Sequence, residues 1–248
     1  MSTIALQYKA RQLAIKKALA SKEQAAQVEA DTIQQTAEDY ENFQILCDAM
    51  ETDLKKLSGK PQLERNKIRE KELIPKYLKA MDDYFINGDE YRNPVLVELV
   101  IMLLDCGINN RDLMAQGVEM ALIAIDQKQP MAKRFKSNLP TFVADQVFTW
   151  ANAEIARDQD PEPEFSDVFN AMINDGWPVP REVLSKYYKL FGDIFHASGE
   201  LEKSLNAFLQ ASTIDPAGAK VKTKIDMIRK KLEKKSESAD SQDTGDDD

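Results

Sequence analysis

The sequence predicts an all-α protein. Only nine of its 248 residues are glycine, and runs in which β-branched and polar residues alternate are hard to find. Apolar residues instead recur at spacings of three and four over long stretches, which is the pattern of a helix with one buried face. With 43% hydrophobic residues, the chain has enough apolar side chains to bury one substantial core or two small ones.

Two breaks divide the chain. Ser-Gly-Lys-Pro at 58–61 ends a helix, and the proline-containing acidic segment at 158–164 is typical of a stiff linker. The last thirteen residues are polar and acidic, a composition that does not support a packed core. We therefore expect an N-terminal helical region at 1–60, a central helical domain at 61–157, a C-terminal helical region at 165–235 and a disordered tail at 236–248.

The N-terminal region contains a long apolar stripe. A basic amphipathic helix is expected over residues 4–20, and Ser21 with Gln24 resembles a capping box that begins a second helix, which ends near Leu57. Such a stripe suits a coiled coil or long helical hairpin that joins copies of the chain, or an ordinary packed helix. The stripe consists of Ala26, Ala30, Ile33, Ala37, Tyr40, Phe43, Cys47, Met50, Leu54 and Leu57.

The central region should contain a succession of shorter helices. Pro75 is expected either to kink a basic helix or to begin the next one, and Asn93 with Pro94 begins a very apolar helix that Gly107 ends. A basic loop at 127–138 is expected to separate the later helices. These later helices are predicted over Asp112–Asp126 and Leu139–Arg157.

The C-terminal region matches the spacing of one tetratricopeptide unit, a pair of helices joined by a tight turn. Gly192 and Ser204 allow the two helices to approach closely, and Pro216 ends the second helix. A single unit cannot bury its own face, so it must pack on the domain or on a neighbouring subunit. The matching positions are Tyr188, Gly192, Phe195, Gly199, Ser204, Phe208, Ala211 and Pro216.

Charge is distributed in blocks, so the net charge of −9 does not describe what a phosphate backbone would meet. Residues 23–54 carry nine acids and no base, and basic segments lie on both sides of them. We expect double-stranded DNA to contact those two segments, with the acidic stretch confining it to them. The alternative is a set of solvated basic faces paired with the acidic block. The residues assigned to DNA binding are Lys9, Arg11, Lys16, Lys17, Lys55, Lys56, Arg65, Lys67 and Arg69.

The sequence contains no recognisable catalytic or nucleotide-binding motif. Walker-type and dinucleotide-binding glycine spacings are absent, so we expect no ATP binding by this chain alone and no cofactor. The acidic candidates for a two-metal nuclease are adjacent or lie in a linker or tail, where carboxylates cannot converge on ions, and we expect no metal site. His196, the only histidine, is expected at a helix end and not as a catalyst. These acidic candidates are Asp82 with Asp83, the 158–164 linker and Asp246–Asp248.

The expected location is the cytoplasm. The most apolar run, Val95–Leu104, is ten residues long and contains Glu98, whereas a membrane span needs about 20 residues. The two cysteines, Cys47 and Cys106, lie far apart without metal-ligand spacing, which is typical of a reducing compartment.

Several motifs stand in order between residues 65 and 235, among them the segment from Arg134 to Trp150 and the turn at Asp105 and Gly107 after the apolar helix. Together they resemble the small terminase subunits of cohesive-end temperate phages with contractile tails, whose signature the segment from Arg134 to Trp150 matches. The last thirteen residues are acidic where the family often has a basic tail, and the first 60 residues match poorly, without a readable helix-turn-helix. The other matching segments are Lys71–Leu78, Lys186–Lys189, Gly192, Gly199, Ile214–Asp215 and Val221–Leu232.

The resemblance implies a subunit that recognises the packaging site on viral DNA and delivers it to a large subunit carrying ATPase and nuclease activities. It also implies a multimer, and we expect a ring-like homo-oligomer. Two other functions are alternatives to this one. One is a metal-dependent endonuclease that cuts the cohesive-end site, because such proteins are often labelled endonuclease subunits. The other is a protein-interaction scaffold without DNA contact.

Overall fold

A computed structural model describes the backbone of residues 29–240 and the side chains of residues 40–234. The described chain is helical and contains no strand, which confirms the predicted all-α class. It divides into two compact units, residues 1–168 and 169–248. The predicted helix at 4–20 and the last eight residues of the predicted tail lie outside the described residues. The regional boundaries predicted from the sequence stay predictions.

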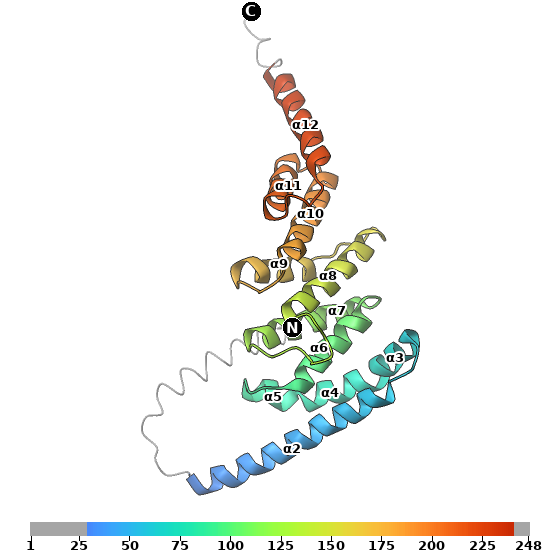
Figure 1. Cartoon of the computed structure of the whole chain (residues 1–248), viewed down its shortest axis with the longest axis vertical. Coiled ribbons are helices and arrows are strands. Elements are labelled where there is room, and N and C mark those ends of the chain that lie inside the picture. The colour runs from blue at the N-terminus through green and yellow to red at the C-terminus, as the bar shows by residue number, and fades with distance from the viewer. Residues whose placement is uncertain (1–28, 241–248) are drawn as a thin grey trace, which may run out of the picture. The chain divides into compact units, whose positions relative to one another are not determined.

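The first unit contains most of the helices (Figure 1). Its helices are α2 (Glu29–Lys56), α3 (Gln62–Ile68), the π-helical turn η1 (Arg69–Leu73), α4 (Ile74–Ala80), α5 (Asp82–Asn87), α6 (Pro94–Gly107), α7 (Arg111–Asp126), α8 (Leu139–Ile155) and α9 (Glu164–Asn174), whose last residues belong to the second unit. The second unit continues with α10 (Arg181–Ala197), α11 (Leu201–Ile214) and α12 (Lys222–Asp240).

Helix α6 is the centre of the first unit. Asn93 caps it by accepting a hydrogen bond from the Leu96 backbone nitrogen at 3.1 Å, and Pro94 occupies the first turn, as predicted. Twelve of its fourteen residues are buried, because α2, α3, η1, α4, α7 and α8 all pack against it. Gly117 of α7 allows a close approach to α6: a Cβ atom there would lie 2.9 Å from Leu104.

The segment around Pro75 passes through a π turn. The residues that join α3, η1 and α4 all have right-handed helical dihedral angles, so the chain continues without a loop. Pro75 stands in the first turn of α4, which agrees with the second of the two predicted alternatives. A proline has no backbone N–H and its ring crowds the preceding turn, and the wider π turn accommodates both effects.

Helix α2 uses only part of its apolar stripe to pack on the first unit. Met50 and Leu57 are buried, and the Phe43 ring meets Tyr91 edge-on with 4.9 Å between ring centroids. Tyr40, in contrast, is 63% exposed. The stripe therefore contributes to the core of its own subunit, while its role in a coiled coil stays a prediction.

Asp53 fastens α2 to α4. Its carboxylate accepts hydrogen bonds from Lys56 at 2.8 Å, from Lys76 at 2.6 Å and from the buried Tyr77 hydroxyl at 2.9 Å. These bonds, led by the one from Lys56, lower the pKa of Asp53 from 3.8 to about 2. The side chain is 12% exposed, so this is one of the better-shielded carboxylates on α2.

The linker before α9 is held to the first unit by Arg111. Its guanidinium donates to the backbone oxygens of Asp160, at 2.6 Å, and Glu162, and it lies 3.2 Å from the Glu164 carboxylate. The same guanidinium stacks over the buried ring of Trp150, 5.6 Å from its centroid. The predicted acidic linker is thus an ordered segment.

The second unit is built on the close pair α10 and α11. A Cβ atom at Gly192 would lie 2.6 Å from the Phe208 ring, and the buried Ser204 hydroxyl donates to the Gly192 carbonyl at 2.7 Å. The predicted close approach at these positions is confirmed, while the tetratricopeptide assignment stays a prediction. Helix α12 covers Phe208 and Ala211 with Ile225 and Ile228. The other tryptophan, Trp177, is buried just before α10.

Helix α12 reaches Asp240, five residues past the end at Lys235 that the sequence predicted. No glycine or proline interrupts residues 236–240, so the helix continues into the acidic composition. Within residues 29–240, no helix is long and apolar enough to span a membrane.

The attachment of α2 through Asp53 makes stability depend on acid pH. Because the folded pKa of about 2 lies below the ordinary value of 3.8, the stabilisation is complete above about pH 5 and is lost as the pH falls through 2. Asp53→Asn should lower the free energy of unfolding at pH 7 by about 1–2 kcal/mol and flatten its acid dependence. Urea unfolding at several pH values measures both. If the free energy of unfolding of Asp53→Asn fell with acid pH as steeply as that of the unaltered protein, Asp53 would not be the source of the pH dependence.

Candidate functional site: an arginine-lined cavity beside helix α2

A cavity of about 590 Å³ opens between α2, α3, the start of α6 and the loop before α8. Apolar side chains of α2 and α6 form much of its wall, and three arginines, from α3, η1 and the loop, complete it. The lining residues are Cys47, Asp48, Met50, Glu51, Leu54, Lys55, Leu57, Ser58, Arg65, Arg69, Pro94, Val95, Glu98 and Arg134. This volume falls within the range of natural ligand and peptide pockets.

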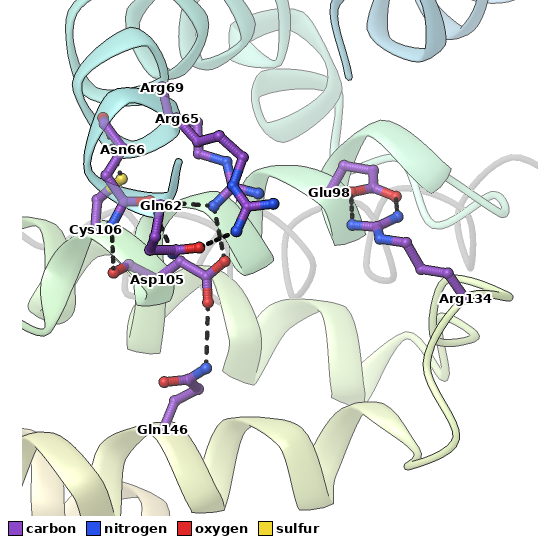
Figure 2. A network of polar contacts seen from close by, with 9 residues as sticks. All are labelled: Gln62, Arg65, Asn66, Arg69, Glu98, Asp105, Cys106, Arg134 and Gln146. Atoms are coloured by element: carbon purple, nitrogen blue, oxygen red, sulfur yellow. Dashed lines mark hydrogen bonds and ion pairs between the residues drawn. The ribbon is translucent and has the colours of Figure 1, made fainter. Parts of the chain in front are cut away.

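Arg69 is the most deeply buried of the three arginines, with 9% of its surface exposed. It donates to Asp105 at 2.8 Å and to the side-chain oxygen of Asn66 at 3.3 Å (Figure 2). Asp105 also accepts from Gln146 of α8 at 3.2 Å, so the carboxylate connects three helical segments. Burial raises the pKa of Asp105, and Arg69 opposes that rise.

Arg134 closes the other end of the cavity. Its two terminal nitrogens bind the two carboxylate oxygens of Glu98, one of them at 2.6 Å, in the fork-to-fork arrangement that Arg makes with carboxylates (Figure 2). The same guanidinium lies 4.7 Å from the centroid of Phe135. The hydrogen bonds to Glu98 raise the pKa of Arg134, so this arginine stays charged.

Arg65 has a weaker set of partners. One terminal nitrogen donates to the neutral side chain of Gln62, and among residues 40–234 no carboxylate forms an ion pair with the guanidinium. The Nε atoms of Arg65 and Arg69 are both buried and have no hydrogen-bond partner. A buried donor without an acceptor costs roughly 1–3 kcal/mol. Beside the apolar wall, two arginine donors are therefore buried without an acceptor.

The structure separates the residues assigned to DNA binding. Lys9, Arg11, Lys16 and Lys17 lie outside the described residues. Lys55 and Lys56 end α2 with their side chains more than two-thirds exposed, and Lys67 is exposed on α3. Arg65 and Arg69, together with Lys55, line the cavity. The nine assigned residues thus include three exposed lysines, two cavity arginines and four positions that the structure does not place.

Arg134, Glu98 and Asp105 were not assigned to the site from charge alone. The pairing of Arg134 with Glu98 gives this arginine a structural part in the fold. Charge blocks cannot reveal such pairs, because the partners stand 36 residues apart in both the Arg134–Glu98 and the Arg69–Asp105 pair. The signal that pointed to Arg134 and Asp105 was their place in the terminase motifs.

Across the described part of the chain, no group of three or more His, Cys, Asp or Glu side chains could hold a metal ion. Asp82 and Asp83 are both exposed in the first turn of α5. His196 stands in the last turn of α10, as predicted, with its Nε2 atom 3.1 Å from the Lys231 amine. Burial raises the pKa of the Cys106 thiol to about 11, which keeps it unreactive.

Comparison with known proteins decides the family. A family model described as "Phage small terminase subunit" matches residues 47–182, more than half of the chain. The chain belongs to the phage small terminase subunit family. This confirms the resemblance seen in the sequence, and it supports a role in phage DNA packaging.

One curated relative comes from Haemophilus phage HP1 (strain HP1c1) and is named "Probable terminase, endonuclease subunit". It is 32% identical over 144 residues, which are 58% of this chain and 47% of the relative. The chain thus spans about half the length of the curated relative that it matches. No solved structure gives a significant match.

The match to the small terminase subunit family covers the whole cavity. Its lining begins at Cys47, the first matched residue, and ends at Arg134. The five assigned DNA-binding residues from Lys55 to Arg69 also lie within the match, whereas Lys9, Arg11, Lys16 and Lys17 precede it. The cavity and the basic end of α2 therefore belong to the part of this terminase subunit that defines the family.

The Arg69–Asp105 pair should stabilise the first unit. Arg69→Met leaves the half-buried carboxylate without its cation, so we expect the free energy of unfolding to fall by about 2–4 kcal/mol. The double variant Arg69→Met with Asp105→Leu should lose less than the sum of its single variants, because the unpaired charge is gone. Urea unfolding monitored by circular dichroism measures both. Lys60→Met, which breaks an exposed pair with Glu64, is the control and should cost less than about 1 kcal/mol. If the losses in free energy of unfolding of Arg69→Met and Asp105→Leu simply added in the double variant, the two residues would not be coupled.

Proposed function

We propose that this small terminase subunit binds viral double-stranded DNA at the packaging site and delivers it to a large subunit that carries the ATPase and nuclease, in the cytoplasm of the bacterial host. The observation that carries the proposal is the family match over residues 47–182. That match includes the basic corner where α2 ends and α3 begins. A binding role also agrees with the lack of a phosphate-binding glycine loop in the sequence.

Lys55, Lys56 and Lys67 are the proposed phosphate contacts within the described residues. All three are exposed, and the first two pair only with acids one turn away, Glu51 and Asp53. The Lys55–Glu51 pair is exposed and worth about 0–1 kcal/mol, so Lys55 can turn towards a phosphate at little cost. Arg65 and Arg69 lie deeper, and their contribution to DNA affinity would come through holding α3 in place.

The N-terminal basic residues complete the proposed interface. Lys9, Arg11, Lys16 and Lys17 precede the acidic part of α2 in the sequence, and Lys55 follows it. Phosphates would be repelled by the acids between these two basic segments and attracted at both. A multimer would repeat each segment, so weak single contacts would add by avidity.

Charge reversal at the α2–α3 corner should weaken DNA binding. Lys55→Glu with Lys67→Glu should lower affinity for packaging-site and random duplexes alike, because phosphate contacts carry no sequence information. Each lost contact should reduce the slope of log affinity against log salt by about one unit. Charge reversal at Lys16 and Lys17 should act in the same way. Gel shifts across a salt series measure both quantities.

The matched control reverses two exposed lysines in the loop before α8, Lys133 and Lys136. It makes the same change of charge and should weaken binding less. If the loop variant abolishes binding while the corner variant binds normally, the proposed DNA surface is misplaced. Absence of salt-sensitive binding by the unaltered protein would favour the scaffold function instead.

Cleavage of the cohesive-end site is the second candidate function, and the name of the Haemophilus phage HP1 relative, an endonuclease subunit, favours it. We expect no cleavage by the isolated chain with Mg²⁺ or Mn²⁺, because Asp82 and Asp83 are adjacent on a helix and point about 100° apart. A nicking assay on packaging-site DNA measures this. Cleavage that disappears in Asp82→Ala with Asp83→Ala would establish the endonuclease function.

A further inference from the structure

Helix α12 of the second unit separates its apolar and charged side chains around its axis. Its apolar side packs on α11 through Ile225, Ile228 and Leu232. Successive residues of an α-helix are rotated by about 100°, so positions three, four and seven apart lie on one side. At these spacings from Met227, residues 222–234 contain lysines and no acid. We call this side, which consists of Lys224, Met227, Lys230, Lys231 and Lys234, the lysine strip.

The acids of the same segment lie elsewhere on the helix. Asp226 and Glu233 are turned by about 100–120° from Met227, on the side that also carries Lys222 and Arg229. Mixed signs along one face are typical of a helix that is only solvated. The lysine strip has a single sign, and a strip of one sign attracts anions of the opposite sign.

The amines of the lysine strip are available to an anion. Lys230 and Lys234 are exposed and form no ion pair within residues 40–234. Lys231 is also exposed, and its nearest printed partner is the Nε2 atom of His196, at 3.1 Å. Lys224, at the other end of the strip, pairs with Asp193 of α10. Like charges one turn apart disfavour a helix, so an anion bound across Lys230, Lys231 and Lys234 would remove that repulsion.

The chemistry of the lysine strip suits a phosphate backbone better than an acidic protein. Met227, which is 43% exposed, is its only apolar side chain. Protein interfaces need an apolar core and are depleted in lysine, whereas phosphates need only cations in density. The strip from Lys224 to Lys234 is about 15 Å long, and each strand of B-DNA presents a phosphate about every 3.4 Å along the duplex axis. Several phosphates therefore fall within its length.

We propose that the lysine strip of α12 is a second contact for the phosphate backbone of double-stranded DNA, separate from the corner where α2 ends and α3 begins. The inference rests on the proposed DNA-binding function and adds a second surface to it. Helix α12 lies in the second unit and beyond the segment 47–182 that matches the family. Phosphate contacts carry no sequence information, so the lysine strip adds affinity and leaves recognition of the packaging site to other residues.

Charge reversal within the lysine strip tests the contact in the full-length protein. Lys230→Glu with Lys234→Glu should weaken binding of packaging-site and random duplexes by about tenfold, and should reduce the slope of log affinity against log salt by about two units. Gel shifts across a salt series measure both quantities. The melting temperature measured by circular dichroism should stay that of the unaltered protein, because both side chains are exposed.

Lys222→Glu with Arg229→Glu is the matched control. Both residues are exposed on the same helix, and the variant makes the same change of charge on the side that carries Asp226 and Glu233. At physiological salt, charges further apart than about 8 Å are largely screened, so affinity should fall less than about twofold.

The acidic residues that follow α12 in the sequence give a second test. Asp246, Asp247 and Asp248 carry charges that would compete with phosphates for the lysine strip. Replacement of all three by Asn should raise DNA affinity in the unaltered protein, and should raise it less in the variant Lys230→Glu with Lys234→Glu. Equal gains in the two backgrounds would mean that DNA lies elsewhere, and would overturn the proposal.

The results distinguish the lysine strip from the α2–α3 corner. If Lys230→Glu with Lys234→Glu binds DNA normally, or loses no more affinity than the control, the lysine strip is not a DNA contact and the proposed function stands on the corner alone. If that variant binds weakly while Lys55→Glu with Lys67→Glu binds normally, the strip is a contact and the corner is misplaced. Absence of salt-sensitive DNA binding by the unaltered protein would overturn both.

Discussion

The arrangement of the first unit depends on the burial of helix α6. It is apolar on nearly every side, so no single partner helix can remove it from water. Helices α2, α3, α4, α7 and α8 together form its cover, and their positions follow from the faces that remain to be covered. The loss of any one of them would expose apolar surface at roughly 25 cal/mol per Å². The cavity lies where this cover is thinnest, between α2 and α3.

The polar residues around α6 decide how its cover is oriented. Asp105, on its last turn, binds Arg69 of η1 and Gln146 of α8, while Glu98, on its first turns, binds Arg134 of the loop. Apolar packing alone has little directional preference, whereas a charged hydrogen bond requires its donor and acceptor to meet at a particular distance and angle. The paired charges therefore restrict how η1 and the loop can lie against α6. The basic corner that we propose for DNA, and the cavity beside it, are thereby held by the same set of helices.

Local signals in the sequence located most of the helices. Asn93 with Pro94, the break at 58–61 and Gly192 each act within a few residues or within one helix pair, and the structure has them as predicted. Long-range partners were not accessible in the same way. Arg69 was assigned to DNA from its basic neighbourhood, and the structure gives it a carboxylate 36 residues away. In the α2 stripe, Met50 and Leu57 are buried and Tyr40 is exposed. This difference likewise depends on which other helices pack against each position.

Each compact unit contains one buried tryptophan, Trp150 in the first and Trp177 in the second. Fluorescence from the whole protein is therefore the sum of two independent reporters. Arg111 lies over the Trp150 ring and also donates a hydrogen bond to the linker at Asp160. The emission of Trp150 should therefore change when the linker detaches. With Trp150→Phe, the remaining signal belongs to the second unit alone. The natural sequence thus makes it possible to ask whether the two units unfold together or one after the other.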